Sequence, residues 1–261
     1  MTSPRRLKFI VSYDGRPFAG WQSQRGGNTV QDVLEAAFAQ VGSERVRVHG
    51  AGRTDAGVHA LAQCAHADVV SRLTPETWMA ALNASLPTAI RVVQCAYVRS
   101  DFHARFSATG KLYRYRIWND RYLSPFEDGR AWHVARPLDL VLLQREAAEF
   151  VGTHDFAGFT ANRGKSARKP HRAAYDFEQS TVRTIHSVRV RRAGKCLTLD
   201  FRGDGFLYKM VRLMVGALVG AATGRAQAGE IATRLAEPAS TSSAARNVAP
   251  AHGLYLVRVF Y

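Results

Sequence analysis

The strongest constraint on the fold is a hydrophobic period that changes repeatedly along the chain. Every second residue over 7–13 is apolar, which predicts a strand. After Thr29, apolar or small residues follow a 3.6-residue period to position 41 and predict a helix that stops at Gly42. The second half repeats this mixture without an obvious linker. We expect an α/β chain of α+β type, with halves at 1–110 and 111–261 that form one continuous unit.

The same patterns locate the remaining elements. Alternating or β-rich apolar runs, bounded by turn residues, predict strands, and wider periodic spacing predicts helices. The expected strands cover 46–48, 61–69, 90–98, 113–117, 184–192, 195–202 and 253–260. The expected helices cover 75–84, 139–151, 207–219 and 229–236, and 160–172 is expected to be a loop.

Charge indicates the partner. The chain has 261 residues with 46% hydrophobic content, enough for a sizeable core, and 36 Lys and Arg against 21 Asp and Glu give a net charge of +15. Such an excess favours polyanions, through attraction and through counterion release from phosphates, so we expect a nucleic acid. A solvated basic surface is the alternative. The basic run 163–172 fits a phosphate backbone or a solvated loop equally well.

The sequence disfavours a disulfide-bonded protein, a membrane protein and a protein with a metal or nucleotide cofactor. Three widely spaced cysteines without a C-x-x-C pair predict reduced thiols in a cytoplasmic protein. The most apolar segment, 206–223, carries Lys209 and Arg212, so we expect no membrane span. The sequence has no H-E-x-x-H helix, no phosphate-binding G-x-x-x-x-G-K-[ST] loop and no dinucleotide fingerprint. We therefore expect neither a metal nor a nucleotide cofactor.

The candidate catalytic group is Asp55. The run from Ala51 to Ala60 contains this one acid, placed between Gly52 and Gly57 and close to Arg53. Glycines let the backbone turn tightly and let another molecule approach closely. An Asp in such a loop beside an arginine is expected to be ionised and presented outward.

The Asp55 loop and other motifs resemble a known family. The loop, Ala51-Gly52-Arg53-Thr54-Asp55-Ala56-Gly57-Val58-His59-Ala60, is similar to the active-site loop of the TruA-type tRNA pseudouridine synthases. Further landmarks of that family match in order along nearly the whole chain. They are Tyr13-Asp14-Gly15, Phe18-Ala19-Gly20-Trp21-Gln22, Thr29-Val30-Gln31, 101–109, Tyr113-Arg114-Tyr115, 153–156, 182–185, 205–212, Val215-Gly216 and 253–256.

The resemblance implies a fold and an activity. The family's fold has a mixed, mostly antiparallel sheet with flanking helices, and two similar halves enclose a basic cleft in a protein that works as a homodimer. The family isomerises uridine to pseudouridine at positions 38, 39 and 40 of the tRNA anticodon stem-loop, without a cofactor. The target base must leave its stack to be reached, which implies base flipping.

The resemblance also assigns roles to four residues. Asp55 matches the essential Asp that acts at ribose C1′, as a nucleophile or as a base; we assign it the nucleophile role. Arg212 matches an arginine that pairs with this Asp, although a helix-surface cation would look the same. Tyr113 matches a tyrosine that stacks on the target uracil, and its alternative is a half-buried strand tyrosine. Arg53 matches a residue that holds the flipped nucleotide or fills the vacated space, and its alternative is a phosphate contact.

Three rival functions stay open. They are a non-catalytic RNA-binding protein on the same scaffold, an N-glycosidase that uses a single carboxylate, and a synthase of this family with other RNA targets. One departure from the family is the stretch between Phe159 and Thr181, which is longer than expected and basic. We hypothesise that neutralising Arg168, Lys169 and Arg172 weakens tRNA binding and flattens its salt dependence.

Overall fold

The computed structural model describes residues 3–42, 46–161, 180–237 and 247–261. These residues form ten strands, mostly antiparallel, and five α-helices, which confirms the mixed α/β class. Contacts group the chain into two compact units, one of 1–114, 129–131 and 251–261 and one of 115–128 and 132–250. The division at residue 110 stays a prediction. The basic loop from residue 162 onward, with Arg168, Lys169 and Arg172, lies outside the described residues.

The sheet of the first unit has the strand order β4-β1-β3-β10, followed by the first part of β5. The central strand β3 pairs antiparallel with β1 and parallel with β10, and β1 pairs antiparallel with β4. The short strand β2 also pairs with β3. The bounds are β1 Arg5–Tyr13, β2 His49–Gly50, β3 His59–Val69, β4 Ile90–Val98, β5 Gly110–Trp118 and β10 Leu254–Phe260.

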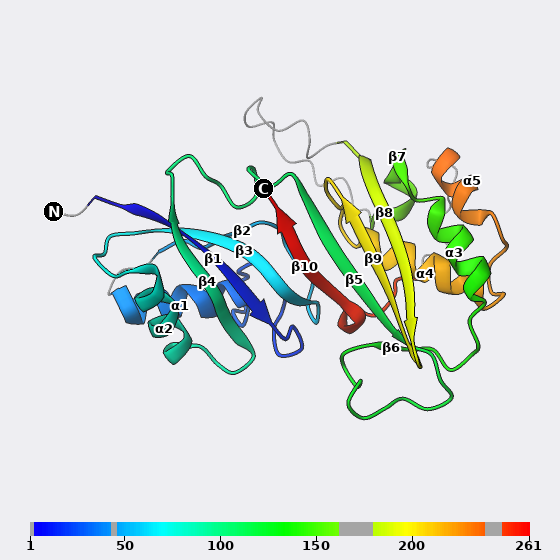
Figure 1. Cartoon of the computed structure of the whole chain (residues 1–261), viewed down its shortest axis with the longest axis horizontal. Coiled ribbons are helices and arrows are strands. Elements are labelled where there is room, and N and C mark those ends of the chain that lie inside the picture. Colours follow the sequence, from blue (N-terminus) through cyan, green and yellow to red (C-terminus); the bar gives the residue numbers. More distant parts are fainter. Residues whose placement is uncertain (1–2, 43–45, 162–179, 238–246) are drawn as a thin grey trace. The chain divides into compact units, whose positions relative to one another are not determined.

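Two helices cover one face of this sheet. They are α1 (Val30–Gly42) and α2 (Pro75–Ser85), which lie together beside β1 and β4 in Figure 1. A chain of aromatic contacts joins the layers, because Phe38 of α1 lies 5.4 Å from Phe9 and 5.3 Å from Trp78 of α2, between ring centroids. The alternation expected in β1 is confirmed, since its odd-numbered residues from Leu7 to Tyr13 are buried.

The second unit combines the end of β5 with β9, β8 and β7, in that order, and a short β6 runs parallel to β5. Three helices gather beside β7 and β8 (Figure 1), and a 3-10 helix at Phe156–Phe159 packs against α4 and α5. The bounds are β6 Trp132–His133, α3 Leu140–Ala148, β7 Gly152–Asp155, β8 Val182–Ala193, β9 Cys196–Gly203, α4 Met210–Ala222 and α5 Glu230–Ala236.

Some boundaries differ from the expectation. The strand expected at 46–48 was wrong, because the pairing with β3 involves His49 and Gly50 instead. The helix expected from 207 begins at Met210, because Lys209 adopts the left-handed region with φ 58° and interrupts the helix. Strands β6 and β7 were not expected, since two and four residues are too few to show a period.

Candidate active site

Asp55 lies in the loop 51–58, which joins β2 to β3 and is called the catalytic loop below. Asp55 is half-buried, and its carbonyl oxygen accepts a hydrogen bond from the Val58 N–H at 3.1 Å. This bond closes a β-turn with Gly57 in its third position at φ 78°, the conformation that a type II turn requires there. Gly57 therefore allows the chain to reverse directly after Asp55.

The segment 15–21, which carries parts of two of the N-terminal motifs, contacts the catalytic loop. The Thr54 carbonyl oxygen accepts a hydrogen bond from the Trp21 N–H at 3.0 Å. A Cβ on Gly20, which has φ 98°, would lie 2.7 Å from that carbonyl oxygen, and a Cβ on Gly15 would overlap the Val58 carbonyl. The glycines of these motifs thus allow the backbone around residues 15 and 20 to approach the catalytic loop more closely than side chains would permit.

Strand β3 holds the start of the catalytic loop. The Ala51 N–H donates to the Cys64 carbonyl oxygen at 2.8 Å, and the Gln63 amide Nε2 donates to the Gly52 carbonyl oxygen at 2.8 Å. Gln63 is fully buried, so its amide is tied to the loop without competition from water. Both bonds fix backbone that immediately precedes Arg53.

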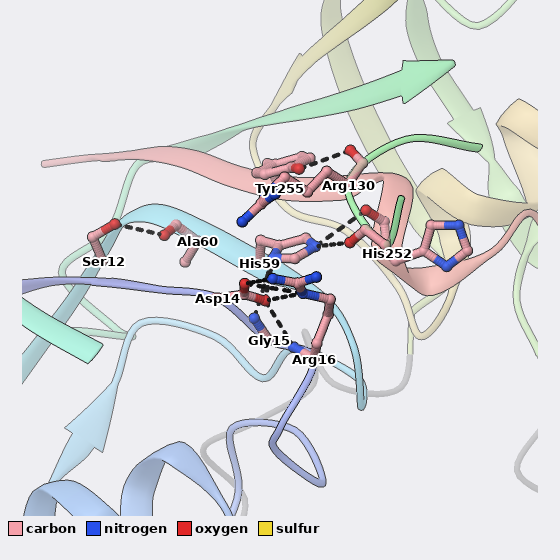
Figure 2. A network of polar contacts seen from close by, with 10 residues as sticks. Ser12, Asp14, Gly15, Arg16, His59, Ala60, Arg130, His252 and Tyr255 are labelled. Carbon is pink, nitrogen blue, oxygen red and sulfur yellow. Dashed lines mark hydrogen bonds and ion pairs between the residues drawn. The ribbon is translucent and has the colours of Figure 1, made fainter. Parts of the chain in front are cut away.

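His59 fixes the other end of the loop. Its Nδ1 accepts the Gly15 N–H at 3.1 Å, so Nδ1 carries no proton and the hydrogen lies on Nε2. Nε2 lies 3.1 Å from the carbonyl oxygens of both Gly129 and His252. Figure 2 shows the imidazole between the Tyr255 ring, stacked at 4.6 Å, and the Asp14–Arg16 ion pair. Burial lowers the pKa of His59, so the imidazole stays neutral while it holds the backbone at Gly15, Gly129 and His252.

His59 was not singled out from the sequence, although it lies in the run that carries Asp55. Two of its partners, Gly129 and His252, lie far along the chain. No spacing in the sequence indicates those contacts. The usable signal is a histidine that directly follows the catalytic loop, at the start of β3.

The charge of Asp55 acts on the Tyr113 hydroxyl. Tyr113 lies in β5 and is buried, with 8% of its surface exposed. Burial raises the pKa of its hydroxyl, and the negative charge of Asp55 raises that pKa further. Arg53 is exposed, and its Nε donates to the Gln22 side-chain oxygen at 3.2 Å.

Arg212 lies in α4 of the second unit and is half-buried. Its Nε donates to the Ala249 carbonyl oxygen at 2.7 Å, and the Ala249 N–H donates to the Arg212 carbonyl oxygen at 3.1 Å. The first bond fixes the inner nitrogen of the guanidinium, and the second fixes the backbone of Arg212. The catalytic roles of Asp55, Arg212, Tyr113 and Arg53 stay predictions.

The described ranges show neither a metal cluster nor a membrane-spanning helix. No group of three or more His, Cys, Asp or Glu side chains there is arranged to hold a metal ion. Among the same residues, no helix is both long and apolar enough to cross a membrane.

Comparison with known proteins shows the family of this chain. A model of the tRNA pseudouridine synthase family matches residues 9–107 and 147–261, which include the catalytic loop and Arg212. The chain belongs to this family. The family resemblance seen in the sequence is thereby confirmed, and so is the expected class of enzyme, an isomerase that acts on tRNA.

Individual relatives agree over almost the full length. The tRNA pseudouridine synthase A of Akkermansia muciniphila is 47% identical over 98% of this chain and 95% of its own. The protein of that name from Acetivibrio thermocellus is 41% identical over 98% of this chain and all of its own. A solved Cbf5-Nop10-Gar1 complex matches with 12% identity and a TM-score of 0.36, over 82% of this chain and 44% of that one.

Proposed function

We propose that this enzyme isomerises uridine to pseudouridine at positions 38, 39 and 40 of the tRNA anticodon stem-loop. The observation that carries the proposal is that Asp55, on a loop fixed at both ends, interacts electrostatically with Tyr113 of β5. A carboxylate for the sugar and an aromatic ring for the base are the two groups that this chemistry needs. Family membership supports the reaction class.

The reaction exchanges one bond to the ribose for another. The bond from C1′ to N1 breaks, the uracil turns, and C5 bonds to C1′; C5 then loses its proton and N1 gains one, so no redox partner is required. We assign Asp55 the attack on C1′, which forms a covalent link that the returning C5 displaces. Removal of a ribose proton by the same carboxylate is the alternative.

Tyr113 is proposed to stack on the flipped uracil. Its raised pKa keeps the hydroxyl protonated near neutral pH, which suits an aromatic surface with a hydrogen-bond donor. Assistance in removing the C5 proton would require the phenolate. That second role therefore predicts a rate that rises with pH.

The two arginines are proposed to act on the Asp55 carboxylate and on the flipped nucleotide. Arg212, with its Nε already bonded to Ala249, is proposed to pair with Asp55 through its terminal nitrogens and keep the carboxylate ionised. Arg53, exposed and beside Asp55, is proposed to hold the flipped nucleotide or fill its place in the stack.

RNA binding is proposed to rest on shape and backbone. The net charge of +15 favours phosphate contacts, and action at three neighbouring positions requires tolerance of sequence. A homodimer around a basic cleft stays a prediction from the family, and a cytoplasmic location stays a prediction from the cysteine pattern.

The test maps pseudouridine in unmodified tRNA that carries uridine at positions 38–40, by carbodiimide treatment and primer extension. We expect new stops at those positions with the wild-type protein and none with Asp55→Asn. Asp128→Asn, which removes the same charge from an exposed residue, is the control and should retain the stops.

Each other outcome supports a rival. Tight tRNA binding without stops supports an RNA-binding protein, and stops elsewhere support a different target set. Release of free uracil supports an N-glycosidase. Retained stops in Asp55→Asn would overturn the assigned role of Asp55.

A further inference from the structure

Three buried polar side chains lie behind the catalytic loop. They are Tyr13 at the end of β1, Thr54 next to Asp55, and Gln63 in β3, with 4%, 7% and 0% of their surfaces exposed. The Tyr13 hydroxyl lies 2.8 Å from Thr54 Oγ1, and Gln63 Nε2 donates to the Gly52 carbonyl oxygen at 2.8 Å. The three residues thus tie two strands to both sides of Arg53.

Gln63 adds to the polar surroundings of the Tyr13 hydroxyl. Although burial raises the pKa of Tyr13 more strongly, the Gln63 side chain lowers that pKa, as a donor to the phenol oxygen does. A phenol donates one hydrogen and can accept another, so the Tyr13 hydroxyl pairs with Thr54 Oγ1 whichever of the two donates.

Tyr13 is linked to both proposed groups of the active site, through a hydrogen bond to the residue before Asp55 and through charge to Tyr113. Its neighbour Thr54 precedes Asp55 directly, and its phenol interacts electrostatically with that of Tyr113. Burial raises the pKa of Tyr13, so its hydroxyl stays protonated and its hydrogen bond with Thr54 persists across the neutral range. Tyr13 therefore contacts the support of Asp55 from the side of the sheet.

We propose that Tyr13 is a positioning residue, whose hydroxyl holds Thr54 and thereby the line along which the Asp55 carboxylate approaches ribose C1′. This inference rests on the proposed function. Tyr13 takes no part in bond making. It limits the freedom of the neighbouring carboxylate, and small misplacements of a reacting group cost large factors in rate.

The first test is Tyr13→Phe, which keeps the ring and removes the hydroxyl. We expect kcat to fall roughly 10- to 100-fold while KM for tRNA stays within about threefold, because RNA contacts are unchanged. The matched control is Tyr97→Phe. The Tyr97 hydroxyl donates to the Leu73 carbonyl oxygen at 2.8 Å and accepts from Trp78 Nε1 at 3.2 Å, at the far end of β4. We expect the control to lose stability and keep kcat.

The second test uses Thr54. Thr54→Ser keeps the hydroxyl and should retain a kcat within about threefold of wild type, whereas Thr54→Val should match Tyr13→Phe. If the two residues act through one hydrogen bond, Tyr13→Phe combined with Thr54→Val should be no slower than either single variant. Thr54→Val and Thr54→Ser keep the proposal testable if Tyr13→Phe fails to fold.

The inference is overturned if Tyr13→Phe and Tyr97→Phe lower kcat equally, or if the effects of Tyr13→Phe and Thr54→Val multiply. Failure of the proposed function would look different, because the wild-type protein would then form no pseudouridine. An active wild type with an unaffected Tyr13→Phe variant rejects the inference about Tyr13 alone.

Discussion

The catalytic loop and the turn between β8 and β9 both depend on glycine, but for different reasons. In the hairpin, Gly194 has φ 58°, and apart from its chain neighbours no heavy atom of the described residues lies within 4 Å of the place where its Cβ would be. In the catalytic loop, Gly57 has φ 78°, and the neighbouring segments require Gly15 and Gly20 for close approach. The conformation of the hairpin turn depends on its own residues. The conformation of the catalytic loop depends also on the neighbouring segments that pack against it.

This difference has a consequence for function. The hairpin turn needs only a residue that tolerates positive φ. The catalytic loop needs contacts from β1, β3 and the segment 15–21 at once, and those contacts hold Asp55 in place. Local changes should therefore be mild in the hairpin and severe around the catalytic loop.

The largest combined effect on stability and activity is expected for Gly15→Ala. The new Cβ would overlap the Val58 carbonyl, which is backbone and cannot rotate away. We expect the free energy of unfolding to fall by roughly 2–3 kcal/mol and kcat to fall about 100-fold as the loop moves. Urea unfolding and steady-state kinetics measure the two effects.

The control for this change is Gly26→Ala. Gly26 lies in a nearby loop without a positive φ, and its Cβ would meet no heavy atom within 4 Å. Gly26→Ala should leave both quantities near wild type. Equal behaviour of the two variants would show that close approach at Gly15 does not hold the catalytic loop.

An intermediate effect is expected from acid. His66 of β3 is 2% exposed, and its Nδ1 accepts the Ala104 N–H at 3.2 Å. Burial, then the nearby His103, His49 and Arg6, lower the pKa of His66 from 6.5 to about 4, against an opposing effect of Asp68. The unfolded chain therefore binds a proton first, so this contribution to stability is present above pH 6.5 and is lost as the pH falls toward 4.

The full loss at His66 corresponds to about 3 kcal/mol, at about 1.4 kcal/mol per pKa unit. Urea unfolding between about pH 7 and pH 4 measures it. His66→Asn keeps an acceptor for the Ala104 N–H and removes the titrating group, so the pH slope of its stability should be shallower than that of wild type. Identical slopes would contradict the assignment to His66.

The smallest effect is expected for Gly194→Ala. An L-residue at φ 58° costs about 1 kcal/mol, and the empty space around Gly194 adds no clash. We expect a small loss of stability in thermal unfolding and unchanged kcat. A large loss of kcat would erase the contrast between the hairpin and the catalytic loop.

The same contrast explains what the sequence could predict. Helices α1 and α2 and strands β1, β4 and β5 follow from periods that their own residues carry, and the N-cap of α2 at Thr74 is also local. Asp55 was identified from its flanking glycines and from the family resemblance. The left-handed Lys209 that delays α4 leaves no mark on the apolar period, and the contacts of His59 with Gly129 and His252 join residues far apart in the chain, which no local pattern encodes.

The most direct test of the role of Asp55 measures chemistry and binding together for Asp55→Asn. Unmodified tRNA labelled with tritium at uridine C5 releases tritium when C5 bonds to C1′, under single turnover with enzyme in excess. We predict release too slow to detect, with tRNA affinity within about threefold of wild type. Release within about tenfold of the wild-type rate would contradict the claim that the Asp55 carboxylate carries the reaction.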